Sequence, residues 1–182
     1  MRKIAVLFLV CLLGVLWGLE VGGVTLPDSI EYGEKNLQLN GAGLRKKFII
    51  KVYAGALYLP QVNSNPTQII SANEAMAVRM HFIYKKVDQK KLIDAWNEGF
   101  EASGYSNKQK IDKFNSFFTK PALKGDIYQI MYSPEAGTSV WFNNKKIGSV
   151  IGFDFKKAVF SIWLGENTNL EKLKEAMLGE VK

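Results

Sequence analysis

The chain has 182 residues, of which 47% are hydrophobic and 23% charged, and its formal net charge is +7. These proportions are typical of a globular domain with one core, and they exclude a disordered chain. The basic residues are spread along the sequence in pairs and accompany no zinc-finger or RNA-binding signature, so nucleic acid is not expected as a partner. The single cysteine, Cys11, excludes a disulfide framework and a thiolate metal site.

The first 23 residues have the three parts of a secretory signal peptide. A basic start (residues 1–3) precedes an uncharged apolar run (residues 4–18), and small residues follow before Val24. The run is shorter than the roughly 20 apolar residues of a membrane-spanning helix. The sequence therefore predicts a signal peptide over 1–23, one domain over 24–182, and export to the periplasm or the outside of a bacterium. An uncleaved N-terminal anchor is the alternative.

Short strands are expected at residues 24–30 and 37–45, followed by a long strand over 48–59 that ends at Pro60. Both alternating faces of the long strand are apolar except at Lys51, which is expected at the surface or at the rim of a pocket. Such a strand is typical of the centre of a sheet that is covered on both sides. A short helix over 65–72 and a strand over 74–84 come next.

The periodicity then changes to that of helices, with apolar residues three and four positions apart. Two helices are predicted at 88–103 and 106–119, with Asp88 and Ser106 as their caps. Three strands follow at 127–132, 138–142 and 147–151, and the last two form a hairpin around Asn143 and Asn144. Two final helices are predicted, at 154–164 and after the capping box that runs from Thr168 to Glu171.

Neighbouring strands joined by tight turns pair antiparallel, so the predicted fold class is α+β. It is a mostly antiparallel sheet backed by a layer of helices. The sequence has no GxSxG, HExxH, P-loop or GxGxxG motif, and no cofactor or metal is expected. The one histidine, His81, lies in the middle of a predicted strand, where a hydrogen-bonded sheet residue is more common than a catalytic one.

Arg45 and Tyr53 are the best candidates for a site on the long strand and the strand before it. A guanidinium can donate two hydrogen bonds to a carboxylate or an enolate, and a phenol adds one more donor. At the mouth of an apolar pocket this pair would bind the head of an amphiphilic acid, or stabilise an oxyanion as it forms. In the alternative reading, Arg45 pairs with a surface acid and Tyr53 belongs to the core.

Several segments resemble one known family. They are residues 39–45 (LNGAGLR), 50–59 (IKVYAGALYL), the AW..GF pattern in 95–100, KGD at 124–126, GTSV at 137–140 and IWLG at 162–165. In order and spacing the chain resembles the chalcone isomerase-like family, and it is most similar to the exported bacterial branch. The resemblance implies an antiparallel sheet backed by helices.

The plant enzymes of this family close a chalcone to a flavanone, and an arginine stabilises the developing enolate. Arg45 matches that arginine. The neighbouring catalytic threonine falls on Tyr53, and the catalytic tyrosine falls near Lys90. The active-site asparagine falls near Asn97, and a late Ser/Thr position falls near Ile162. This chain thus keeps the arginine of the plant enzymes but has other residues at several of their polar positions. The resemblance therefore disfavours efficient chalcone cyclisation.

An arginine with a tyrosine at the threonine position is similar to the fatty-acid-binding branch, in which the pair holds a carboxylate. The first hypothesis is therefore a non-catalytic protein that binds an apolar carboxylate such as a fatty acid, through Arg45, Tyr53, Asn97 and Ile162. The second is an isomerase of the intramolecular lyase type, with Arg45 as its catalytic residue and an enone-like or flavonoid-like substrate. The third is a partner or scaffold role with an empty or collapsed pocket.

Overall fold

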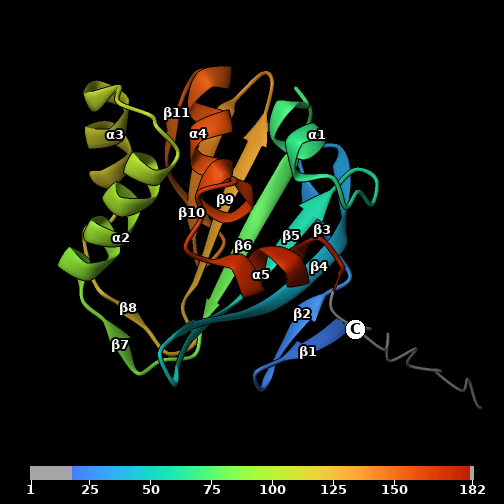
Figure 1. The fold of residues 1–182 in the computed structure, drawn as a ribbon, viewed down its shortest axis with the longest axis vertical. Helices are drawn as coiled ribbons and strands as arrows, with labels where there is room; N and C mark the ends of the chain where they lie inside the picture. Colours follow the sequence, from blue (N-terminus) through green and yellow to red (C-terminus); the bar gives the residue numbers. More distant parts are fainter. Residues whose placement is uncertain (1–17, 181–182) are drawn as a thin grey trace, which may run out of the picture.

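A curled antiparallel sheet of seven strands organises the protein, whose computed structural model describes residues 18–180. Its strand order is β11–β10–β9–β6–β5–β4–β3, and the helices form a layer on one face (Figure 1). The predicted α+β fold is confirmed. The strands of this sheet are β3 (Ser29–Tyr32), β4 (Lys35–Lys47), β5 (Ile50–Leu59), β6 (Met76–Phe82), β9 (Ile127–Ser133), β10 (Gly137–Phe142) and β11 (Lys145–Val150).

Two small strand pairs and five helices complete the described part of the chain. The pairs are β1 (Gly18–Val21) with β2 (Val24–Pro27), and β7 (Lys86–Val87) with β8 (Ala122–Leu123). The helices are α1 (Pro66–Ser71), α2 (Gln89–Ala102), α3 (Lys108–Asn115), α4 (Phe153–Leu164) and α5 (Glu171–Met177). Within residues 18–180, no helix has the length and apolar character needed to cross a membrane.

The two faces of β5 belong to two separate cores, as the alternation predicts. Tyr53, Leu57 and Leu59 pack under the helices, whereas Ala54, Ala56 and Tyr58 pack on the other face, which the β1–β2 pair helps to cover. On that second face the sheet curls, so that the Tyr32 hydroxyl of edge strand β3 lies 3.1 Å from Ser139 Oγ of β10. The helices therefore occupy the outer face of the curl.

The start of the predicted long strand is wrong. Phe48 and Ile49 are not buried strand residues but a two-residue turn between β4 and β5, because Lys47 pairs directly with Ile50. Their side chains are 92% and 94% exposed. The apolar run continues through the turn without a glycine or an asparagine, so the sequence pattern does not mark the place where the chain reverses.

The capping interactions predicted for three helices also differ from the structure. The cap of α3 is Asn107 rather than Ser106, since its Oδ1 accepts a hydrogen bond from Lys110 N at 3.2 Å. Asp88 occupies the N-cap position of α2 as predicted, but its carboxylate makes no capping hydrogen bond and pairs instead with Lys86. Thr168 does not cap α5; its hydroxyl donates to the carbonyl of Ile162 at 2.7 Å and thereby fixes the end of α4.

A buried cation joins α1 to α4. Lys156 is fully buried, and its Nζ donates to the carbonyl oxygens of Ile69, Ile70 and Ala72 at 2.7–2.9 Å. Burial lowers the pKa of Lys156 to about 8. These three bonds satisfy carbonyl groups that the end of α1 leaves without partners inside the helix.

The predicted signal peptide overlaps the described residues only at its end. Gly18–Val21 form β1, which pairs with β2, and residues 1–17 lie outside the described part of the chain. Cleavage after residue 23 would remove β1 from the fold. The cleavage itself stays a prediction.

Candidate functional site

Arg45 and Tyr53 are direct partners on neighbouring strands. Arg45 of β4 lies opposite Tyr53 of β5, and Tyr53 lies opposite Phe82 of β6. Directly opposed residues of antiparallel strands share a face, with their Cβ atoms about 5 Å apart. Tyr53 and Phe82 both belong to the core under the helices, and their ring centroids are 5.5 Å apart. The row Arg45–Tyr53–Phe82 therefore points toward the helical layer.

The Tyr53 hydroxyl is held from the opposite side by a tryptophan. Trp163 of α4 donates a hydrogen bond from Nε1 to Tyr53 Oη at 3.1 Å, and both residues are buried. Burial raises the pKa of Tyr53, while the bond from Trp163 and the charge of Arg45 act in the opposite direction. The phenol thus keeps its proton at neutral pH. Among residues 18–180 this O–H donates no hydrogen bond, so it is free to donate to an incoming anion.

Arg45 lies at the open end of this row. Its side chain is partly exposed, and one guanidinium nitrogen, Nη1, donates to the backbone carbonyl of Lys46. No acidic side chain among the described residues forms an ion pair with Arg45. The surface ion pair of the alternative reading is therefore not formed in this part of the chain. The remaining N–H groups of the fork are free for a ligand.

Behind Tyr53, aromatic side chains fill the space between sheet and helices. Trp163 meets Trp96 of α2 edge to face, with centroids 5.5 Å apart. Trp96 in turn contacts Phe114 and Phe118, at 5.1 and 5.3 Å. All of these rings are buried. An apolar ligand that enters past Arg45 would have to separate them.

The other two predicted ligand-binding residues lie between helices. Asn97 of α2 is exposed, and its Oδ1 accepts a hydrogen bond from Asn115 Nδ2 of α3 at 2.7 Å. Ile162 of α4 is buried against Gly99, where an added Cβ would come within 2.7 Å of it. Within residues 18–180 no hydrogen bond joins either residue to Arg45 or Tyr53. Their role in a ligand site stays a prediction.

Two further polar residues lie away from Arg45. Lys90 is exposed on α2, and its Nζ lies 2.8 Å from the Asp94 carboxylate. His81 alternates with Phe82 on β6 and so faces the other side of the sheet, where burial and the charge of Arg79 lower its pKa. Within residues 18–180 no hydrogen bond joins either residue to the Tyr53 hydroxyl.

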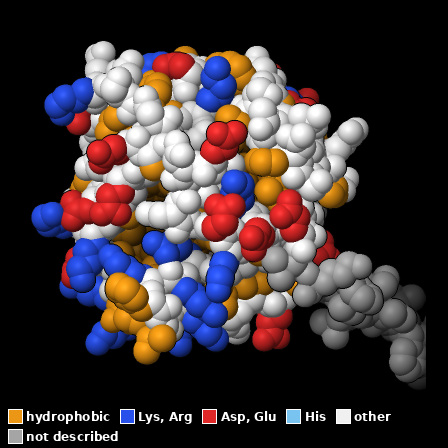
Figure 2. Space-filling view, in the orientation of Figure 1, with side chains coloured by type: hydrophobic (Ala, Val, Ile, Leu, Met, Phe, Trp, Pro, Cys, Tyr) orange, Lys and Arg blue, Asp and Glu red, His pale blue; other side chains and the backbone are white. Residues whose placement is uncertain are grey.

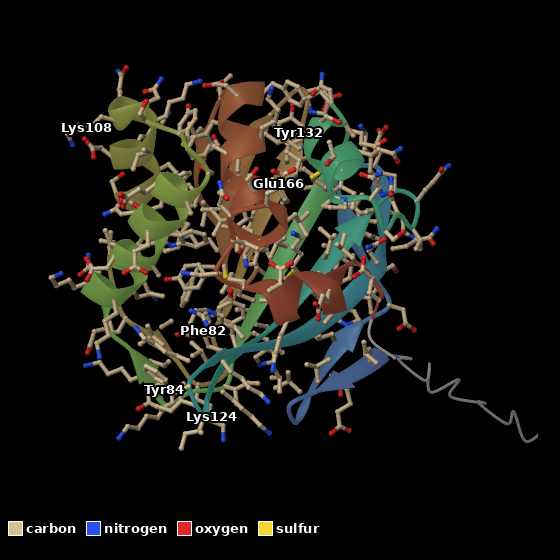
Figure 3. The ribbon with its side chains drawn as sticks, in the orientation of Figure 1. Phe82, Tyr84, Lys108, Lys124, Tyr132 and Glu166 are labelled. Carbon is tan, nitrogen blue, oxygen red and sulfur yellow. The ribbon has the colours of Figure 1, made fainter. Side chains whose placement is uncertain are left out.

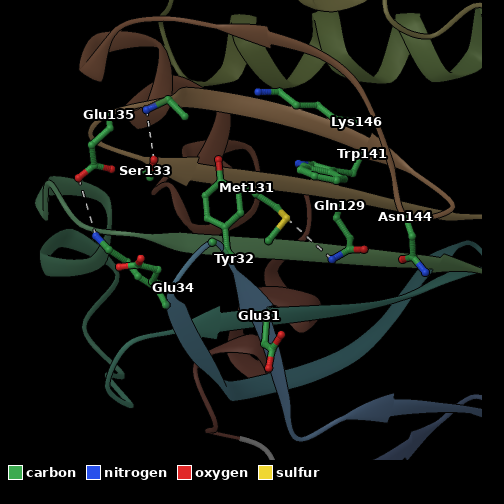
Figure 4. Close-up of a pocket in the computed structure, with 13 residues that line it drawn as sticks. Glu31, Tyr32, Glu34, Gln129, Met131, Ser133, Glu135, Trp141, Asn144 and Lys146 are labelled. Carbon is green, nitrogen blue, oxygen red and sulfur yellow. Dashed lines mark hydrogen bonds and ion pairs between the residues drawn. The ribbon is translucent and has the colours of Figure 1, made fainter.

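The two most pronounced hollows in the surface formed by residues 18–180 are not lined by Arg45 or Tyr53. The first, of about 720 Å³, lies on the curled face away from the helices (Figure 4). Its floor is formed by Gln129, Met131 and Trp141, and Tyr32 stands at its side. The second, of about 390 Å³, lies between α2 and α3 and includes Asn97. The space beside Tyr53 is instead occupied by the aromatic rings.

Sequence reasoning missed the hydrogen bond from Trp163 to Tyr53. Helical spacing assigns Trp163 to the core, which is correct for its ring but does not reveal its partner. The two residues are 110 positions apart, so no local pattern connects them. The exposed apolar turn at Phe48 and Ile49 was missed as well, although the three lysines around it are visible in the sequence.

The sequence profile described as chalcone isomerase-like matches residues 18–179, from the start of β1 to beyond the end of α5. No curated protein sequence matches the chain. The crystal structure of a fatty-acid binding protein from Arabidopsis thaliana superimposes with a TM-score of 0.72 and 20% sequence identity. The alignment covers 87% of this chain and 93% of that one. At this identity the likeness establishes a shared fold.

Proposed function

Because the chain belongs to the chalcone isomerase-like family, we propose that it binds an apolar carboxylate, such as a fatty acid, and does not cyclise chalcones efficiently. The observation that carries this proposal is the cross-strand pair of Arg45 and Tyr53, with Trp163 bonded to the phenol. The similarity in fold to a protein named for fatty-acid binding supports it.

The head group would be held by two kinds of donor. The guanidinium of Arg45 supplies charge and N–H groups, and the Tyr53 O–H supplies one further hydrogen bond. Hydrogen bonds to an ionised carboxylate are shorter and about twice as strong as neutral ones. Trp163 fixes the phenol by donating to its oxygen, which leaves the phenol's own hydrogen directed to another acceptor.

The tail would lie among the aromatic rings between sheet and helices. Those rings are in contact, so binding requires a movement of α2 or α4 or a rotation of side chains. Met177 of α5 lies beside Gly55 next to Tyr53, where an added Cβ would be 2.9 Å from its Cε. A methionine is an adaptable wall for such a pocket because it is flexible and polarizable.

Catalysis is disfavoured because the polar residues at the other matched positions bond elsewhere and not to Arg45 or Tyr53. Closure of a chalcone needs polar groups that orient the phenolate and handle a proton as the enolate forms. Lys90 is exposed and paired with Asp94, and Asn97 is bonded to Asn115. The pair that remains, Arg45 with a neutral Tyr53, is suited to holding an anion.

The test is thermal unfolding of the purified protein with palmitate, together with native mass spectrometry for a ligand that copurifies. Ligand at 100 times its Kd stabilises the native state by about 2.7 kcal/mol, which corresponds to a rise in Tm of several degrees. Arg45→Ala should abolish the rise, and Tyr53→Phe should reduce it. Lys47→Ala, which removes the same charge from an exposed neighbour, is the matched control and should retain it.

An absence of any shift in the wild type, or an equal shift in Arg45→Ala, would contradict the proposal. A chalcone should disappear no faster with the protein than without it. Turnover above the spontaneous rate that is lost in Arg45→Ala would instead establish the isomerase alternative. These two assays separate binding from catalysis because they use the same variants.

We also propose that the protein is exported. The support is the basic start and uncharged apolar run in residues 1–18. The intact mass of the protein recovered from a bacterial periplasmic fraction tests this. A cleaved mass there supports export, and the cleavage position shows whether β1 remains in the mature chain.

A further inference from the structure

The turn between β4 and β5 exposes two large apolar side chains, and we refer to Phe48 and Ile49 as the apolar tip. They are 92% and 94% exposed, and Ile50, the first residue of β5, is 42% exposed. Phe48 also has a φ of 54°, in the left-handed region, which is unfavourable for an aromatic residue. A two-residue turn that serves folding alone would place asparagine or glycine there. The apolar tip therefore needs an explanation other than folding.

Lysines surround the apolar tip. Lys46 and Lys47 precede it, Lys51 follows Ile50, and all three are exposed. Within residues 18–180 none of them forms an ion pair. We refer to these three residues as the lysine collar. A positive group that has no acidic partner in the protein is available to an anionic surface.

The same end of the molecule carries further basic and apolar groups. The chain after β6 returns to the base of the hairpin, where Ile83 N and Tyr84 N both donate to the carbonyl of Val52. Lys85 follows there and accepts a backbone hydrogen bond from Lys124. Figure 3 places Tyr84 and Lys124 at this end, and Figure 2 shows apolar side chains there among Lys and Arg side chains.

From this arrangement we infer that the end of the protein formed by the apolar tip and the lysine collar docks on an anionic lipid bilayer. Phe48 and Ile49 enter the boundary between head groups and acyl chains, and the lysines remain at the level of the anionic head groups. Insertion of apolar side chains combined with lysine contacts is the usual basis of interfacial membrane binding. A two-residue point ringed by like charges fits a fluid anionic surface better than a rigid protein groove.

This docking does not depend on the ligand that Arg45 holds. Arg45 directly precedes the lysine collar, so docking would bring the open end of the Arg45–Tyr53–Phe82 row to the lipid surface. Binding to vesicles is measured without any added fatty acid. Its failure is therefore distinguishable from a failure of the proposed function.

The first experiment is co-sedimentation of the full chain with vesicles of phosphatidylglycerol and phosphatidylcholine in equal parts, and with pure phosphatidylcholine. Each lysine near an anionic surface contributes about fivefold in affinity, so K46A/K47A should weaken binding about 25-fold. The matched control K108A/K113A removes two exposed charges from α3, at the opposite end (Figures 1 and 3), and should leave binding unchanged.

The turn variant F48N/I49G removes the apolar side chains and keeps a favourable turn, so it should stay folded and lose at least tenfold in affinity. Equal binding by F48N/I49G and the wild type would overturn the inference. So would equal binding to the two vesicle types, or an equal loss in K108A/K113A.

A second readout does not depend on other parts of the chain that touch lipid. In a Cys11→Ser background, an environment-sensitive dye on Ile49→Cys should shift its emission to the blue with the mixed vesicles. The same dye on Lys108→Cys of α3, at the opposite end of the molecule (Figure 3), should not. No shift at position 49, or the same shift at both positions, would overturn the inference.

Discussion

Two β-hairpins at one end of the sheet reverse the chain in two residues, but their tips differ in chemistry. Phe48 and Ile49 join β4 to β5, and Asn143 and Asn144 join β10 to β11. Asn143 and Asn144 have φ values of 47° and 66°, which asparagine tolerates better than most residues. Phe48 has nearly the same φ, 54°, with an aromatic side chain.

The asparagine tip contributes to its own fold. Asn143 Oδ1 accepts a hydrogen bond from Ile127 N at 2.8 Å, and Asn143 Nδ2 donates to Asp126 Oδ1 at 2.9 Å. Among residues 18–180 the apolar tip makes no comparable contact, since its side chains lie almost wholly in solvent. The strands beside the apolar tip have 13 and 10 residues, against six in each strand of the other hairpin. A long ladder can hold an unfavourable turn, whereas a short one depends on its turn residues.

The largest effect is expected when the asparagine tip receives the apolar residues. N143F/N144I places two bulky residues in the left-handed region, at about 1–2 kcal/mol each, and removes hydrogen bonds worth about 1 kcal/mol. The free energy of unfolding in urea should fall by about 4 kcal/mol. A loss below about 1 kcal/mol would show that tip chemistry has little influence on this hairpin.

Alanine at the first position of each tip tests the same difference between the two turns with a smaller change. Asn143→Ala should lower the free energy of unfolding by about 1–2 kcal/mol, because the amide of Ile127 and the carboxylate of Asp126 lose a partner. Phe48→Ala should change it by less than about 0.5 kcal/mol, as is usual for an exposed position. The two values come from urea denaturation under identical conditions. Similar losses in both variants would contradict the proposed difference between the tips.

Replacing the apolar tip by residues that favour a tight turn should stabilise the protein. F48N/I49G relieves the aromatic residue of its left-handed conformation and should raise the free energy of unfolding by about 1 kcal/mol. The same variant should bind anionic vesicles more weakly. Opposite signs for stability and for vesicle binding would sharpen the distinction between a turn that serves folding and one that serves an interface. A loss of both would point to disruption of the hairpin.

The smallest effect concerns lysines with and without acidic partners. Unlike the lysine collar, Lys110 of α3 donates to Asp154 at 2.7 Å, and Tyr105 donates to the same carboxylate at 2.7 Å. The bond from Lys110, aided by the one from Tyr105, lowers the pKa of Asp154 from 3.8 to about 2. A carboxyl whose pKa is lower in the folded state stabilises the protein above its unfolded pKa. This contribution is lost as the pH falls from 3.8 through about 2.

The wild type should therefore exceed Asp154→Asn in stability by less than about 1 kcal/mol at neutral pH, because exposed ion pairs are screened. The difference should vanish in acid. Urea denaturation of both proteins across this pH range measures it. K46A/K47A should show no such pH-dependent difference from the wild type, and a difference that did appear would imply an acidic partner for the lysine collar.

The features that could be predicted from the sequence are those that repeat with a period. Side chains along 53–59 point alternately to the two faces of the strand, and both faces are apolar. Leu92, Trp96 and Phe100 recur at helical spacing. Both patterns predict buried side chains, and the structure confirms this. The turn at Phe48 could not be found this way, because the hydrophobic run continues through it. The candidate site also has a part that the sequence predicts and a part that it does not. Arg45 and Tyr53 stand out on nearby strands, but the bond from Trp163 joins distant parts of the chain and depends on how α4 packs over the sheet.

The bond between Trp163 and Tyr53 also gives the protein an optical signal of its own. Indole emission responds to the polarity and hydrogen bonding of its surroundings, and Trp163 touches both Tyr53 and Trp96. A carboxylate that engages the phenol, or a tail that parts the rings, changes the surroundings of Trp163 directly. Intrinsic fluorescence can therefore follow occupation of this site in solution without any label.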